Sequence, residues 1–147
     1  MGYQLTEKTI DDFQVGDRGY FAKTITEADV YLFAGITGDV APHHVNAEYA
    51  RTTRFGERIA HGMLTASLVS AALSRLVSPG AISESHEFRF TAPVRFGDTI
   101  TATVEVIEKD VQRKRLKLRT VCTNQRGEVV LDGTAVQVMA IRKRANG

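Results

Sequence analysis

The sequence of 147 residues has a single cysteine, three prolines and no run of eighteen or more apolar residues. The lone Cys122 cannot form a disulfide within the chain, so a reduced, intracellular compartment is expected. The missing apolar run predicts that no helix spans a membrane. The first ten residues lack the apolar core of a secretory signal. We therefore expect a cytoplasmic protein with no membrane partner.

Internal repeats and linker-like stretches are also missing, and the net charge is only +2. So weak a charge does not by itself indicate a nucleic-acid partner. The basic segment 113–119 has no aromatic side chains beside it on which bases could stack. Hydrophobic residues make up 43% of the chain and charged residues 24%, which is typical of a globular protein. We predict a single domain over residues 1–147 with one core.

The first part of the chain predicts a strand and two helices. Residues 20–25 are typical of a short strand, and Thr26 with Asp29 forms a capping pattern for a helix that Gly38 ends. Residues 39–58 predict an irregular segment with short helical pieces at most. From residue 59 to 77 nearly every residue is small or apolar, which predicts a buried helix over about residues 60–78.

After Gly80 the apolar pattern changes to a period of two, which is typical of strands. One buried helix followed by long antiparallel strands predicts an α+β fold, with the sheet wrapped around that central helix. Unpaired edge strands in such a sheet favour pairing with a second copy of the chain. Three serines of the helix are interpreted as small residues that let the sheet pack closely: Ser67, Ser70 and Ser74. The predicted strands cover residues 85–91, 99–108, 113–123 and 129–141.

The segment after Gly38 carries a carboxylate and an imidazole that could serve as an acid/base pair. Asp39 and His44 lie five residues apart on a segment constrained by Pro42, and both side chains can reach one water molecule. A carboxylate can accept a proton from that water, and a histidine can exchange a proton near neutral pH. The spacing is equally compatible with a local helix cap and a surface histidine.

The start of the long helix lacks the usual capping residue. Ile59, Ala60 and His61 precede it in place of Ser, Thr, Asp or Asn, so the first N–H groups have no obvious side-chain partner. Uncapped donors at the positive end of a buried helix predict a site for developing negative charge. Gly62 would let a ligand atom approach the backbone closely, or would merely relieve crowding at the helix start.

Together these segments resemble the MaoC-like, (R)-specific enoyl-CoA hydratases, which have the hot-dog fold. The hydratase signature contains Asp, any residue, Asn, Pro, an apolar residue and His, and residues 39–44 of this chain read DVAPHH. Residues 59–63, IAHGM, are similar to the family's segment that leads into the central helix. The resemblance covers about residues 12–139.

The resemblance implies a hydro-lyase that adds water to a trans-2-enoyl-CoA, or dehydrates an (R)-3-hydroxyacyl-CoA. It implies a homodimer or a dimer of dimers, and no metal or other cofactor. Asp39 and His44 would hold the water at the β-carbon. The Gly62 N–H would bind the thioester oxygen, with His61 and Met63 also contacting the substrate.

Two positions depart from the family pattern, and three arginines lie near the predicted site. Ala41 replaces an Asn that is expected to hydrogen-bond near the water or the thioester. His43 replaces an apolar residue and would favour a polar or carboxylated acyl chain. The candidates for contacts with the CoA phosphates are Arg51, Arg54 and Arg58. The basic segment 113–119 is the alternative, although it is also typical of a solvated strand face.

Other functions remain open at this point. A hot-dog thioesterase would share the fold, but residues 58–79 contain no acidic side chain of the kind such enzymes often place on or near the central helix. A non-catalytic acyl-CoA-binding or partner subunit is compatible with Ala41. A serine hydrolase is disfavoured because no Gly-x-Ser-x-Gly motif is present. A metal site is disfavoured because adjacent histidines seldom bind one ion; its ligands would be Asp39, His43, His44 and His61.

Overall fold

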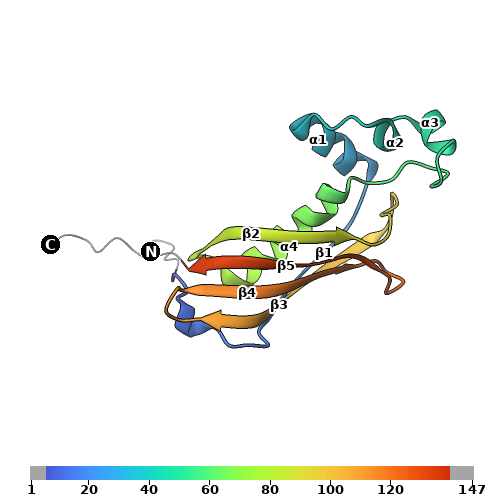
Figure 1. Cartoon of the computed structure of the whole chain (residues 1–147). Helices are drawn as coiled ribbons and strands as arrows, with labels where there is room; N and C mark the ends of the chain where they lie inside the picture. Colours follow the sequence, from blue (N-terminus) through green and yellow to red (C-terminus); the bar gives the residue numbers. More distant parts are fainter. Residues whose placement is uncertain (1–5, 140–147) are drawn as a thin grey trace, which may run out of the picture.

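The computed structural model describes residues 6–139, which form a five-stranded antiparallel sheet with a long helix packed against it (Figure 1). The order of strands is β1-β3-β4-β5-β2, so β1 and β2 form the two edges. This arrangement confirms the predicted α+β fold. The strands are β1 (Arg18–Thr24), β2 (Ala81–Phe90), β3 (Thr99–Asp110), β4 (Arg115–Thr123) and β5 (Val129–Met139).

Each strand matches a predicted one, with ends shifted by a few residues. The largest shift is in β2, which begins at Ala81 and not at residue 85. The last two residues of the predicted final strand, 140 and 141, lie outside the described residues. Register shifts between Val106 and Glu108, and between Cys122 and Thr123, interrupt the simple alternation. A bulge of this kind leaves no mark in a period-two pattern.

Helix α4 (Gly62–Val77) is the central helix, and it begins two residues later than predicted. It packs against β1, β3, β4 and β2. Its buried side chains join the core residues of the strands, among them Val104 and Leu118, which are fully buried. The residues that α4 buries are Leu64, Thr65, Ala66, Leu68, Val69, Ala72, Leu73 and Val77.

One interpretation of α4 was wrong. Ser67, Ser70 and Ser74 lie on its exposed face and not against the sheet. The sequence suggested complete burial because this face is uncharged, but serine is small and neutral enough to occupy either environment. In the single chain, α4 therefore presents Ser67, Ser70 and Ser74 to solvent, with Arg75 as the one exposed charge of the helix.

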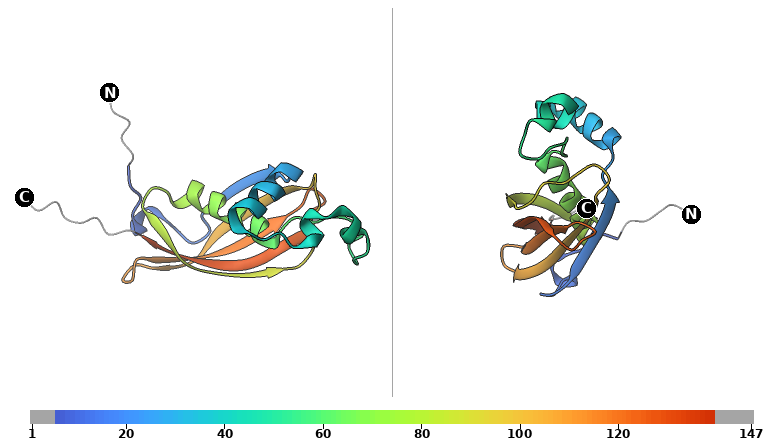
Figure 2. Two further views of the ribbon diagram at one scale, coloured as in Figure 1. Left: turned by 90° about the horizontal axis from the view of Figure 1, so that it is seen from above. Right: turned by 90° about the vertical axis from the view of Figure 1, so that its right-hand side faces the viewer.

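The arm, residues 26–58, projects beyond one end of the sheet next to the start of α4 (Figures 1 and 2). Thr26 accepts a hydrogen bond from the Asp29 N–H, so the predicted capping box is present. Gly38 ends the first helix of the arm in the left-handed region at φ 77°, as its sequence position predicted. The arm contains α1 (Glu27–Thr37), α2 (Pro42–Val45) and α3 (Ala47–Arg51).

The basic segment of β4 has the predicted two-faced pattern. Leu116 and Leu118 are fully buried, while the intervening basic side chains form ion pairs on the other face. These pairs are Arg115 with Glu84, Lys117 with Glu108, and Arg119 with Asp132. No helix of residues 6–139 is long and apolar enough to cross a membrane.

Candidate active site

The loop after α1 brings Asp39 and His44 to the junction between the arm and the sheet. Asp39 follows the helix end and is exposed, while His44 lies in α2 and is only 6% exposed. Pro42 stands at the first position of α2, where its missing N–H leaves no hydrogen bond unmade. The Ala41 N–H donates to Asp39 Oδ1 at 3.3 Å, so the carboxylate has one weak local partner.

The orientation of His44 is set by the segment that precedes α4. Its Nδ1 lies 2.7 Å from the carbonyl oxygen of Ile59. A carbonyl can only accept, so Nδ1 carries the hydrogen and Nε2 has the free lone pair. Burial lowers the pKa of His44 below its ordinary value of 6.5, and repulsion from His61 and His43 adds to this effect against the opposing Ile59 hydrogen bond. His44 is therefore a neutral hydrogen-bond acceptor at pH 7.

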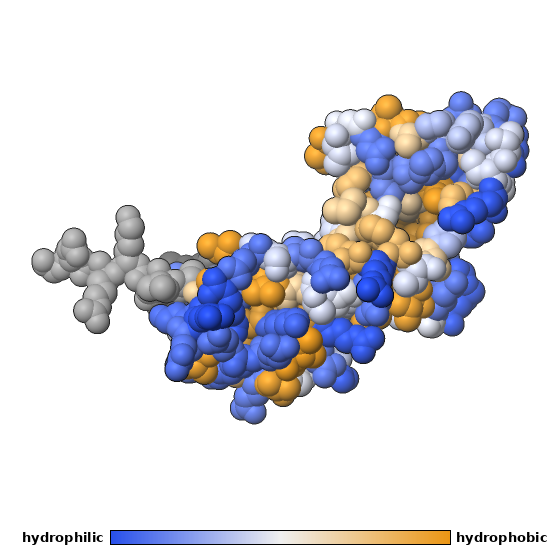
Figure 3. All heavy atoms as spheres, in the orientation of Figure 1, coloured by the Kyte–Doolittle hydropathy of each residue, from blue (hydrophilic) through white to orange (hydrophobic). Residues whose placement is uncertain are grey.

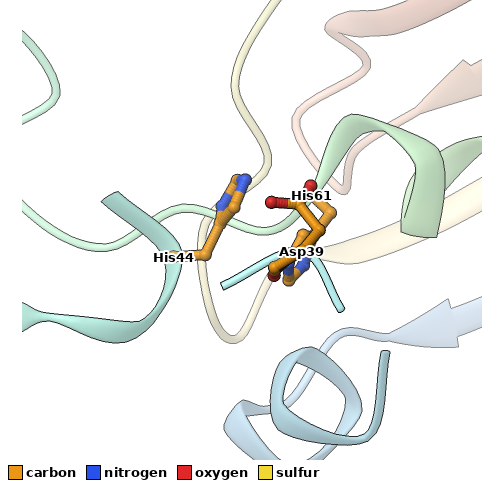
Figure 4. Close-up of side chains that lie close together, drawn as sticks. All are labelled: Asp39, His44 and His61. Carbon is orange, nitrogen blue, oxygen red and sulfur yellow. Dashed lines mark hydrogen bonds between the residues drawn. The ribbon is translucent and has the colours of Figure 1, made fainter. Parts of the chain in front are cut away.

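His61 lies beside both predicted catalytic residues (Figure 4). It is 1% exposed, and its Nε2 lies 2.9 Å from the main-chain oxygen of Asp39, to which it donates. Its ring stacks on that of His44, with centroids 3.9 Å apart and an interplanar angle of 30°. The other ring nitrogen, Nδ1, is buried and has no hydrogen-bond partner.

The start of α4 has the uncapped geometry that the sequence predicted. His61 is the N-cap residue and makes no side-chain cap hydrogen bond. Within residues 6–139, none of the backbone hydrogen bonds at the helix start uses the Gly62 N–H. A Cβ atom at residue 62 would meet the ring of Phe90 at 3.0 Å, so a glycine also lets β2 approach the helix.

A cavity of about 400 Å³ opens beside these residues. Figure 3 shows the hollow between the arm and the sheet, with apolar residues along part of its wall. The polar side is formed by Asp39, His43 and His44, and the remaining wall is largely apolar. The further lining residues are Arg54, Phe55, Ile59, Ala60, His61, Gly62, Met63, Thr65, Phe90, Thr91, Ala92, Pro93, Val94 and Val130.

The structure thus brings together most of the predicted site residues. Asp39, His44, His61, Gly62 and Met63 all line the cavity, and Met63 is 58% exposed. The sequence interpretation gave no site role to residues that contribute much of the apolar wall. Those residues are Phe55, Phe90, Val94 and Val130. They come from separate elements, and only the folded chain places them together.

The three candidate arginines differ in their surroundings. Arg51 pairs with Glu48, and Arg58 pairs with Glu27 while lying over the Phe96 ring at 4.9 Å. Arg54 lines the cavity and lies over the Phe55 ring at 4.9 Å, and no ion pair of Arg54 is found within residues 6–139. The binding of CoA phosphates by these arginines stays a prediction.

Asp39, His44 and His61 each offer a ligand atom, and these atoms lie within 4.8 Å of one another. The lone pair of an imidazole lies in the plane of its ring, and rings inclined by only 30° direct their lone pairs nearly parallel rather than toward one ion. The stacking of His44 on His61 therefore disfavours joint metal coordination. The arrangement suits proton exchange with a water molecule better than metal binding.

Comparison with known proteins places this geometry in context. The family model described as "MaoC like domain" matches residues 14–127. The (R)-specific enoyl-CoA hydratase of Rhodospirillum rubrum is 48% identical over 133 residues, which are 90% of this chain and 92% of that protein. The 3-hydroxybutyryl-CoA dehydratase of Methylorubrum extorquens is 43% identical, over 92% and 87% of the two chains.

A solved structure extends the similarity to three dimensions. The unliganded R-hydratase PhaJ1 from Pseudomonas aeruginosa superposes with a TM-score of 0.84 at 39% identity. The match covers 91% of this chain and 86% of that one. The residues that the family model matches, 14–127, include the arm, the central helix and strands β1 to β4.

Proposed function

The chain belongs to the MaoC-like domain family and has its hot-dog fold, and we propose that Asp39 and His44 carry out its chemistry. It is an (R)-specific enoyl-CoA hydratase or 3-hydroxyacyl-CoA dehydratase. The observation that carries the residue assignment is the position of a neutral, oriented His44 beside the Asp39 carboxylate on the wall of the cavity.

The water is held between Asp39 and His44 in this mechanism. Its hydrogens are donated to the carboxylate and to the free Nε2 lone pair of His44. The water oxygen forms a bond to the β-carbon as the α,β double bond breaks, and one water proton passes to the pair. The same pair returns a proton to the α-carbon, so the enzyme regains its starting protonation. Dehydration follows the same steps in reverse.

The Gly62 N–H stabilises the negative charge that this addition moves onto the thioester oxygen. It stands at the positive end of α4, where it has no partner within the described chain. A fixed donor for a developing oxyanion contributes about 3–4 kcal/mol in well-studied enzymes. In this proposal the thioester oxygen lies at Gly62, and the β-carbon, two bonds beyond the thioester carbonyl carbon, faces Asp39 and His44.

The rest of the cavity receives the acyl chain and the start of CoA. Its apolar wall suits a hydrocarbon chain, and His43 adds one imidazole at 4.0 Å from the His44 ring. We propose that Arg54 contacts a CoA phosphate, because it lies at the cavity without a carboxylate partner among the described residues. Arg51 and Arg58 are weaker candidates since each already pairs with a glutamate.

We also propose that the active form is a homodimer joined along β2. This edge strand is exposed along most of its length, with Ile82 at 66% and Phe90 at 52%. The uncharged face of α4 with Met63 is exposed as well. The opposite edge is less free, because Arg75 donates to the main-chain oxygen of Tyr20 in β1. Pairing of two β2 strands would extend the sheet and satisfy the free backbone groups of this edge.

The assembly can be tested with a charge on the β2 edge. Light scattering should give a mass near twice 16.2 kDa, or a multiple of it, for the unmodified protein. Ile82→Lys should shift the protein toward 16.2 kDa, because it would place a charge in the interface. Val111→Lys, on a turn where the side chain is 53% exposed, is the matched control and should leave the mass unchanged. A monomeric, active unmodified protein would contradict the proposed dimer.

The reaction itself is tested by following two signals on crotonyl-CoA. Absorbance of the conjugated thioester should fall without release of free thiol, and the product should be the (R)-3-hydroxy thioester by chiral chromatography. A thiol reagent gives no background from the native protein, because Cys122 is fully buried and burial raises its pKa to about 12. Thiol release that matches the absorbance loss would indicate thioester hydrolysis instead.

Four further expectations stay predictions: a cytoplasmic location, no nucleic-acid partner, no cofactor, and a preference of His43 for polar acyl chains. The last can be measured with the same assay by comparing crotonyl-CoA with an enoyl-CoA that ends in a carboxylate.

A further inference from the structure

His61 makes contacts that its sequence position does not suggest. Its Nε2–H donates to the main-chain oxygen of Asp39 at 2.9 Å, across 22 positions of the sequence. Its ring stacks on His44, and the ring of Phe33 in α1 contacts it at a tilt of 50° with centroids 5.0 Å apart. The ring at the start of α4 therefore packs against side chains of two arm helices, α1 and α2.

We propose that His61 is a positioning residue, which holds the Asp39 carboxylate in place through the hydrogen bond to the Asp39 main chain. The inference rests on the proposed function, since it assumes that Asp39 acts on the water. It departs from the substrate contact that the sequence resemblance implied for His61. Nε2 is engaged by the main chain of Asp39, and only the buried Nδ1 lacks a hydrogen-bond partner among the described residues.

The need for such a residue follows from how weakly Asp39 is held otherwise. The residue is exposed, follows a glycine in the left-handed region, and its carboxylate accepts only a 3.3 Å hydrogen bond from Ala41 within the described chain. His61 is 1% exposed and directly precedes α4, which packs into the core. Its hydrogen bond therefore ties a loosely held loop to a rigid element. A displacement of about 1 Å in a catalytic group can reduce turnover on the order of 10²-fold.

Three substitutions separate the hydrogen bond from the ring. His61→Gln keeps an N–H donor at nearly the reach of Nε2, His61→Asn has a donor that is too short, and His61→Phe keeps a ring without a donor. The Asn and Phe variants should lose about 10–100-fold in kcat, with KM for crotonyl-CoA changed by less than about threefold. The Gln variant should recover most of the kcat. Circular dichroism and thermal melting identify any variant that is not folded.

A double substitution tests whether His61 acts through Asp39. In an Asp39→Asn background, His61→Asn should lower kcat by less than about threefold further, because the group that it positions is already inactive. A purely structural role would predict that the two losses multiply. The inference is overturned by multiplied losses, by normal kcat in the folded Phe variant, or by a Gln variant as slow as the Asn variant.

These outcomes are distinct from failure of the proposed function. If Asp39→Asn alone retains normal turnover, the acid/base assignment is wrong, and the inference about His61 falls with it. If Asp39→Asn is inactive while folded His61→Phe is fully active, the assignment stands and only the positioning role is rejected. Phe33→Leu is the control for packing: it alters a ring contact of His61, keeps the hydrogen bond to Asp39, and should leave kcat within about threefold of normal.

Discussion

The arm and the sheet with α4 contribute to the site in different ways. The sheet and α4 form the core, in which residues such as Leu116, Leu118 and Val69 are fully buried. The arm buries little of its own apolar surface, and Ile36 of α1 is 83% exposed. Yet the arm carries Asp39 and His44, while the core region carries Gly62 with its main-chain donor.

This difference shows how the proposed catalytic pair can be held in a fixed position on a weakly packed segment. Three hydrogen bonds tie the arm to the residues before α4: the Ile59 N–H to His43, His44 to the Ile59 carbonyl, and His61 to Asp39. They align the arm with the rigid helix start without requiring a core inside the arm. The stability of the molecule and the chemistry of the site should therefore respond to different substitutions.

The largest expected effect is on chemistry and comes from the arm. Asp39→Asn and His44→Gln should each lower turnover of crotonyl-CoA by at least about 10²-fold, because each removes a group that exchanges protons with the water. The double variant should be little slower than either single variant, since the residues act as a unit. Melting temperatures should stay near that of the unmodified protein. Asp132→Asn on the outer face of the sheet is the control and should keep normal turnover. Normal turnover in Asp39→Asn or in His44→Gln would remove the substituted residue from the mechanism.

The largest expected effect on stability comes from the core. Leu118→Ala should lower the free energy of unfolding by about 2–5 kcal/mol, because the side chain is fully buried and the sheet cannot collapse into the space. The activity per folded molecule should change little. Leu32→Ala on α1, where the side chain is 65% exposed, should change the free energy by less than about 0.5 kcal/mol. Denaturant unfolding at one fixed protein concentration measures the free energy of unfolding of both variants. Equal losses in Leu118→Ala and Leu32→Ala would mean that the arm has a core of its own.

Local patterns were predicted well from the sequence, and contacts between distant segments were not. The capping box of Thr26 and the turn at Gly38 depend on neighbouring residues, so the sequence contains the full signal. The contact of His61 with the main chain of Asp39 joins residues 22 positions apart, and no spacing rule indicates it. The exposed face of α4 was misjudged for a related reason: hydropathy does not tell a serine that faces solvent from one that faces a partner.

A smaller effect is expected in the pH dependence of the reaction. Burial lowers the pKa of His44 below 6.5, and only the neutral form accepts a hydrogen bond from water. The value of kcat/KM should thus stay level as the pH falls through 6.5 and decline only at lower pH. The free energy of unfolding changes with pH in the same direction. As the pH falls, His44 of the unfolded chain binds a proton before His44 of the folded chain does. The contribution of His44 to stability is therefore complete above about pH 6.5, and it is lost as the pH falls toward the pKa of the folded state.

The measurement is a profile of kcat/KM against pH, with stability checked at each point so that unfolding is not mistaken for titration. The residual activity of His44→Gln is the control and should lack this decline. A decline centred at or above pH 6.5 would mean that the buried, neutral His44 of the structure is not the reactive form.

The smallest expected effect distinguishes an arm arginine from one on the sheet. Arg54→Gln should raise KM for crotonyl-CoA by a few-fold, about 1 kcal/mol of binding, since an exposed contact with a phosphate is weak. Its kcat should not change, because the phosphates lie far from the reacting carbons. With the N-acetylcysteamine thioester of crotonate, which has no phosphate, the same substitution should leave KM unchanged. Arg119→Gln alters an exposed pair with Asp132 on the outer face of β4 and should affect neither substrate. If Arg54→Gln raises KM for the substrate without phosphates, Arg54 shapes the acyl cavity. If Arg119→Gln raises KM for crotonyl-CoA alone, the CoA contact lies on the sheet and not on the arm.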